Sequence, residues 1–85
     1  MRITVAGMHC ARTERTLTNV REAASKFGDE VEVVWKESPL WAPEQGATHT
    51  PSVVVNNRVK VSGRIPSLYE LEQWIADELE DELAA

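Results

Sequence analysis

Residues 2–10 read Arg-Ile-Thr-Val-Ala-Gly-Met-His-Cys, and this stretch decides how the rest of the chain is interpreted. Polar and apolar side chains alternate from Arg2 to Val5, which is typical of a short strand. Gly7 then predicts a turn, because glycine adopts backbone conformations that other residues avoid. The first strand therefore leads directly to Cys10, the only cysteine in the sequence.

A helix is predicted immediately after this cysteine, from Ala11 to Phe27. Gly28 supplies the left-handed position that commonly ends a helix. The β-branched run from Glu30 to Trp35 predicts a second strand, which a crossover helix would place parallel to the first. The apolar residues of the predicted helix recur at helical spacing, at Leu17, Val20, Ala24 and Phe27.

The middle of the chain has a weaker pattern. Between Lys36 and Thr50, only the segment from Trp41 to Gln45 predicts a short helical turn. Two valine-rich runs follow, Ser52–Val55 and Val59–Ser62, joined by Asn56-Asn57-Arg58. Asparagine tolerates positive φ, so this connection predicts a tight hairpin between two antiparallel strands.

The last helix is predicted to begin at Ser67-Leu68-Tyr69-Glu70. In such a capping box the serine and the glutamate side chains satisfy each other's free backbone N–H donors. The whole order is then β-α-β-(short α)-β-β-α, which predicts an α/β domain with a four-stranded mixed sheet and helices packed against it. This is the order of a minimal thioredoxin-like fold, and we expect residues 1–85 to form one such domain.

Length and charge narrow the classes of function. The 85 residues suit one small core, and the net charge is −5. An acidic chain is a poor general partner for nucleic acid or an anionic membrane. The acidic run Asp77–Glu82 predicts a solvated helix face. No stretch has the apolar length of a membrane span or the character of a signal segment, so we expect a cytoplasmic protein.

Cys10 is the residue most suited to chemistry. At the start of a helix, its sulfur would face free N–H donors and the positive end of the helix dipole, which favour thiolate over thiol. Arg12 and Arg15 add positive charge nearby. A thiolate is the nucleophile of disulfide exchange, and a lone cysteine cannot form an intramolecular disulfide. The alternative is a small buried apolar residue without reactivity.

Three segments resemble the small thioredoxin-like redox-active disulfide proteins of archaea and bacteria, which are of glutaredoxin size. They are Gly7–Thr13, Thr50–Val55 and Val61–Ser67. In the resemblance, Cys10 aligns with the attacking cysteine of the family's Gly-x-x-Cys-x-x-Cys motif. Thr13 stands where the resolving cysteine should be, which distinguishes this chain from a dithiol oxidoreductase.

The resemblance implies roles for two more positions. Pro51 matches a proline that is typically cis, and Thr50 would offer backbone groups to an extended peptide or glutathione. Without the resemblance, Pro51 is an ordinary trans proline at the first residue of a strand. The hydroxyl of Thr13, one turn after Cys10, would donate a hydrogen bond to the thiolate, or would instead satisfy a backbone donor.

A copper-binding loop is the competing interpretation of this region. The sequence around Met8 and Cys10 also resembles the Gly-Met-x-Cys-x-x-Cys loop of heavy-metal-associated domains, and Cu(I) prefers soft ligands. His9, and His49 from the loop before Pro51, would complete such a site. The absent second thiolate and the hairpin order both weigh against it, so no metal site is assigned.

The sequence therefore predicts a monothiol thioredoxin-like or glutaredoxin-like protein that forms mixed disulfides with a small thiol or a protein thiol. Glutathione is the only co-substrate expected, and oxidation would link two copies of the chain. A non-catalytic binding or adaptor domain is the alternative. The predicted catalytic residues are Cys10 and Thr13, and the predicted substrate contacts are His9, Arg12, Thr50 and Pro51.

Overall fold

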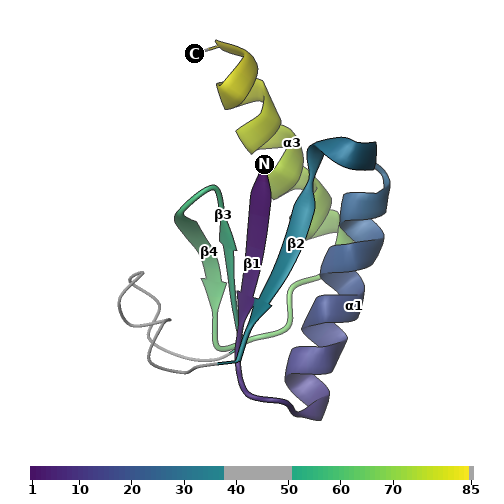
Figure 1. Ribbon diagram of the computed structural model, residues 1–85, viewed down its shortest axis with the longest axis vertical. Coiled ribbons are helices and arrows are strands. Elements are labelled where there is room, and N and C mark those ends of the chain that lie inside the picture. The colour runs from purple at the N-terminus through teal and green to yellow at the C-terminus, as the bar shows by residue number, and fades with distance from the viewer. Residues whose placement is uncertain (38–50, 85) are drawn as a thin grey trace.

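The computed structural model describes residues 1–37 and 51–84 (Figure 1). The helical turn expected at Trp41–Gln45 lies outside these residues. In chain order the elements are β1 (Arg2–Ala6), α1 (Ala11–Ser25), a short 3₁₀ turn (Gly28–Glu30), β2 (Glu32–Lys36), β3 (Ser52–Val55), β4 (Arg58–Ser62) and α3 (Leu68–Ala84).

The four strands form one mixed sheet in the order β2-β1-β3-β4. The pairing of β1 with β2 is parallel and sets Val5 opposite Trp35. The pairings of β1 with β3 and of β3 with β4 are antiparallel. The predicted mixed sheet is confirmed, and its central strand β1 ends beside the segment that carries Cys10.

Helices α1 and α3 pack against each other and against the sheet (Figure 1). The core between them contains Ile3 and Val5 from β1, Val20 from α1, and Leu71 and Ile75 from α3, all fully buried. Burial of each such side chain contributes roughly 1.5–3 kcal/mol. This packing holds α1 rigidly on the sheet, so the residues at its first turn have defined positions.

The backbone conformations of the β3–β4 hairpin and of the end of α1 can be compared with those predicted. Asn56 and Asn57 both have positive φ, 49° and 68°, which confirms the predicted tight turn. Helix α1 ends at Ser25 rather than at the predicted Phe27. The physical reason is that the N–H groups of the next two residues donate to carbonyls three positions back, so the last turn tightens before Gly28 reverses the chain at φ 66°.

The capping box at the start of α3 is confirmed. The Ser67 N–H donates to Glu70 Oε1 at 3.1 Å, and the Glu70 N–H donates to Ser67 Oγ at 3.2 Å.

Further along α3, the prediction of a solvated acidic face is wrong at Glu78, which is 3% exposed. Its Oε1 lies 3.5 Å from Arg58 Nε and 3.7 Å from Lys60 Nζ, so β4 draws this carboxylate inward.

No helix among residues 1–37 and 51–84 has the length and apolar character that a membrane span requires.

Candidate functional site

Cys10 occupies the N-cap of α1, at the end of the loop that leaves β1 (Figure 1). Its backbone is extended, with φ −155° and ψ 169°, and its carbonyl accepts the first helical hydrogen bond from the Glu14 N–H at 2.9 Å. The thiol is exposed and makes no side-chain cap to the helix. The sulfur is therefore accessible and lies at the positive end of the helix.

Thr13 lies against the thiol from the first turn of α1. Its Oγ1 is 3.5 Å from Cys10 Sγ, and the residue is only 1% exposed. The hydrogen bond with this side chain, followed by the influence of the nearby Thr13 N–H group, lowers the pKa of Cys10 below its usual value. The N–H and the charge of Arg12 lower the pKa further, and partial desolvation opposes them. The contacts thus favour a thiolate at an exposed position.

Gly7 allows this turn to form. A methyl group on its Cα would lie 2.6 Å from Thr13 Oγ1 and 3.6 Å from Pro51 Cα. Any larger residue would therefore displace the hydroxyl that contacts Cys10. The sequence indicated a turn at Gly7, and the Gly-x-x-Cys spacing was the signal for a special position, but the contact with Thr13 emerges only in the folded chain.

Pro51 is buried at the start of β3, close to Gly7. Its carbonyl accepts a hydrogen bond from the Gly63 N–H at 2.9 Å, which connects the loop before β3 to the segment after β4. Thr50, and with it the predicted cis bond to Pro51, lies outside the described residues. The cis geometry stays a prediction.

His9, which was predicted as a substrate contact, lies beside two neighbours. Its Nε2 lies 3.3 Å from Glu14 Oε1, and its ring centroid is 5.6 Å from that of Trp35. Trp35 in turn donates from Nε1 to the Gly7 carbonyl at 2.9 Å. Trp35 therefore supports the loop before Cys10, a function that its place at the end of β2 did not reveal.

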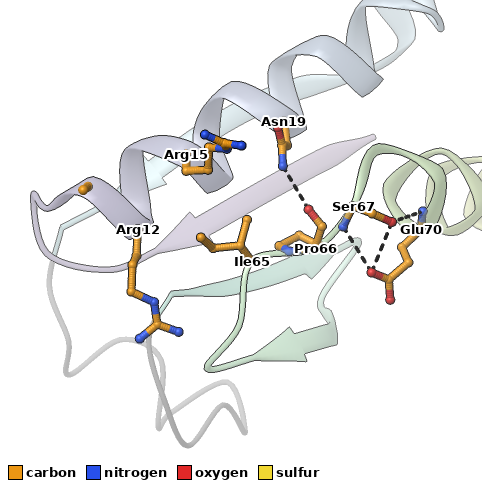
Figure 2. A pocket seen from close by; sticks show the side chains of 8 residues that line it. Arg12, Arg15, Asn19, Ile65, Pro66, Ser67 and Glu70 are labelled. Carbon is orange, nitrogen blue, oxygen red and sulfur yellow. Dashed lines mark hydrogen bonds between the residues drawn. The ribbon is translucent and has the colours of Figure 1, made fainter.

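Arg12 connects the site to the segment between β4 and α3. Its Nη2 donates to the Gly63 carbonyl at 2.7 Å. About two turns further along α1, Asn19 Nδ2 donates to the Pro66 carbonyl at 3.0 Å. Between these two hydrogen bonds lies an open groove of about 610 Å³, which we call the α1–α3 groove (Figure 2). Its lining residues are Ala11, Arg12, Arg15, Asn19, Ile65, Pro66, Ser67 and Glu70.

The ligands of the alternative copper-binding interpretation are only partly within the described residues. Within residues 1–37 and 51–84 no group of three or more His, Cys, Asp or Glu side chains is arranged to hold a metal ion. Met8 and His9 are both exposed, and the partner shown for the Cys10 thiol is Thr13. His49, the other proposed ligand, lies outside the described residues.

Comparison with known proteins agrees with this geometry. The family model described as "Thioredoxin domain" matches residues 1–76. The chain belongs to the thioredoxin domain family. It is also 29% identical over 76 residues to the protein named "Thioredoxin" from Methanothermobacter thermautotrophicus (strain Delta H), a match that covers 89% of this chain and 99% of the relative.

Membership of the thioredoxin family confirms the predicted thioredoxin-like fold. It also supports a thiol-redox role, because the family match includes the segment that carries Cys10.

Proposed function

We propose that this protein is a monothiol thioredoxin-like protein whose Cys10 forms mixed disulfides with thiol partners. The observation that carries the proposal is the exposed Cys10 thiol at the start of α1, with Thr13 Oγ1 3.5 Å from its sulfur. A lowered pKa raises the fraction of thiolate at neutral pH. The sequence contains no second cysteine that could release a bound partner.

The chemistry is a pair of exchange steps. The Cys10 thiolate attacks a partner disulfide, RS–SR′, forming a Cys10–SR disulfide and releasing R′S⁻. A second thiolate, R″S⁻, then attacks the sulfur of R, giving RS–SR″ and restoring the Cys10 thiolate. No net electrons enter the protein over one cycle, because R″S⁻ replaces R′S⁻ as the partner of R. Glutathione or a protein thiol would supply R″S⁻, and a reducing cytoplasm would keep such thiols available.

Each predicted residue has a defined part in this proposal. The Thr13 hydroxyl and N–H stabilise the thiolate as nucleophile and as leaving group. Arg12 adds positive charge and holds the neighbouring loop through Gly63. Thr50 and Pro51 would position the partner's backbone, and His9, packed on Trp35, would form the outer edge of the site. When no other thiol is present, the Cys10 thiolate of one copy would attack the Cys10–SR disulfide of a second copy, which links the two chains and releases RS⁻.

The pH dependence of Cys10 alkylation by iodoacetamide tests the proposal. The thiol should react as a group whose pKa lies below that of an ordinary cysteine, and Thr13→Val should raise that pKa because the hydroxyl is lost. Thr18→Val is the matched control, since the Thr18 hydroxyl donates to the Glu14 carbonyl on the same helix at 3.0 Å. Thr18→Val should leave the Cys10 pKa unchanged.

Oxidised glutathione provides the second readout. Mass spectrometry should detect a protein–glutathione adduct that excess reduced glutathione removes. A thiol with an ordinary pKa and no adduct would contradict the proposal and favour the adaptor function, which needs the fold and the binding loop but no reactive thiol.

A further inference from the structure

The α1–α3 groove begins next to the proposed nucleophile. Ala11 and Arg12, which follow Cys10 directly, form one end of it. Figure 2 shows Arg12, Arg15 and Asn19 on α1 along one side, and the segment from Ile65 to Ser67 along the other. The groove is therefore adjacent in the chain to the residue that would bind a partner, since Ala11 follows Cys10 directly.

The groove is positively charged on an acidic protein. Within residues 1–37 and 51–84 no carboxylate pairs with Arg12 or Arg15, whereas the chain as a whole carries a net charge of −5. Glu70, the one carboxylate in the lining, is held by Arg64 through two hydrogen bonds of 2.9 and 2.6 Å. Its charge is thereby compensated, and the two guanidinium groups on α1 dominate the local field.

The groove is also preformed. Hydrogen bonds from Arg12 to Gly63 and from Asn19 to Pro66 hold its two sides together. Ile65 is 36% exposed and gives the wall opposite Arg15 an apolar surface, while Pro66 beside it is almost fully buried and anchors that segment. Such a combination of an apolar wall and arginines without a carboxylate partner among the described residues suits a peptide with an acidic side chain, because little ordering of the protein is needed on binding.

We propose that the α1–α3 groove binds an acidic peptide segment of a protein partner, next to the cysteine that exchanges with Cys10. This inference deepens the proposed function and rests on it. Arg15 lies five residues beyond Cys10, or about 7.5 Å along the helix axis. An extended peptide covers this distance in about two residues. The partner's Asp or Glu should therefore stand about two residues from its reacting cysteine.

The test measures binding without any thiol chemistry. Full-length protein with Cys10→Ser is labelled with ¹⁵N and titrated with a peptide that carries serine in place of cysteine and Glu two residues away. A matched peptide carries Gln instead of Glu. The Glu peptide should bind about three- to tenfold tighter at low salt, the effect of one or two exposed ion pairs. High salt should remove the preference. Shifted amide signals should include those of Arg15, Asn19 and Ile65.

Two arginine variants locate the effect. Arg15→Gln should abolish the preference for the Glu peptide. Arg21→Gln is the matched control, because Arg21 is exposed on the same helix and lines a different hollow, beside Leu17 and Trp35. It changes the net charge equally and should leave the preference intact. Retention of the amide spectrum shows that each variant is folded.

Three outcomes would overturn the inference: equal binding of the two peptides, equal effects of both arginine variants, or glutathione binding in the groove as tightly as the Glu peptide. The last would assign the groove to a small thiol instead. Because Cys10 is replaced in this experiment, an unreactive thiol in the alkylation assay would reject the proposed function without affecting the binding result.

Discussion

The two long helices of this protein begin in opposite ways. Helix α3 begins at Ser67, whose side chain and that of Glu70 satisfy each other's backbone donors. Helix α1 begins at Cys10, which makes no side-chain cap and leaves its thiol exposed. Both starts carry the same dipole and the same free N–H groups. The comparison teaches that a helix start is available for chemistry when no local carboxylate or hydroxyl has already used its donors.

The variant with the largest expected effect on stability alters the start of α1. Gly7→Ala places a methyl group 2.6 Å from Thr13 Oγ1, so the first turn of α1 must shift. We expect a loss of about 1–3 kcal/mol in the free energy of unfolding, measured by urea denaturation. The Cys10 pKa should also rise, because the Thr13 hydroxyl moves away from the sulfur.

Gly28→Ala serves as the control for this change. Gly28 has φ 66° and nothing within 4 Å of an added methyl group, so its cost of about 1–2 kcal/mol is conformational only. The Cys10 pKa should stay unchanged there. If Gly7→Ala leaves both stability and pKa at their original values, the close contact of Gly7 with Thr13 has no functional role.

A second experiment moves the thiol from one helix start to the other. In a Cys10→Ser background, Ser67→Cys puts the only thiol at the N-cap of α3. The Glu70 carboxylate, whose Oε1 lies 3.3 Å from Ser67 Oγ, opposes a second negative charge there. We expect iodoacetamide alkylation near neutral pH to be about tenfold slower than at Cys10, equivalent to one pKa unit. Identical pH profiles would mean that the helix start alone controls the thiol.

A third change removes the cap of α3. Ser67→Ala deletes the hydroxyl that accepts from the Glu70 N–H and should destabilise the protein by about 1 kcal/mol. The pKa of Cys10 should not change, since the two helix starts lack a shared hydrogen bond among the described residues. Thermal unfolding and alkylation on the same sample test both statements, and a shifted Cys10 pKa would show that the two starts are coupled.

The smallest expected effect is the pH dependence of the stability that Glu70 contributes at the start of α3. Hydrogen bonds from Arg64, followed by the Ser67 backbone, lower the pKa of Glu70 from 4.5 to about 2. A carboxylate with a lowered folded-state pKa stabilises the protein above pH 4.5, and this contribution is lost as the pH falls toward 2. Urea midpoints at pH 5 and near pH 2.5 should differ less for Glu70→Gln than for the original chain. An equal difference would exclude Glu70 as a source of acid sensitivity.

The elements of the fold were largely predictable because their signals are local. Alternation in β1, the paired asparagines before β4 and the capping box at Ser67 each involve neighbours within a few positions, and all appear in the structure. The errors lie at element ends. The prediction extended α1 to Phe27, where three-residue hydrogen bonds replace helical ones, and periodicity does not report that change.

The candidate site likewise contains local features that were predictable and long-range features that were not. Cys10 at the start of a helix and its contact with Thr13 were predictable, because the two residues are only three positions apart. The long-range hydrogen bonds that hold the surrounding loops in place were not predictable. Trp35 binds the Gly7 carbonyl across 28 positions, and Arg12 reaches Gly63 across 51.

The sequence by itself therefore determined the order of elements, the helix starts and the position of the single thiol. All three depend on backbone conformations and hydrogen bonds within one or two turns of chain. Only the tertiary structure decided that Gly7 must remain small beside Thr13, that Glu78 is drawn inward, and that Arg12 and Arg15 face the segment before α3. These features depend on how strands pair and helices pack, and such long-range geometry has no periodic signature in a single sequence.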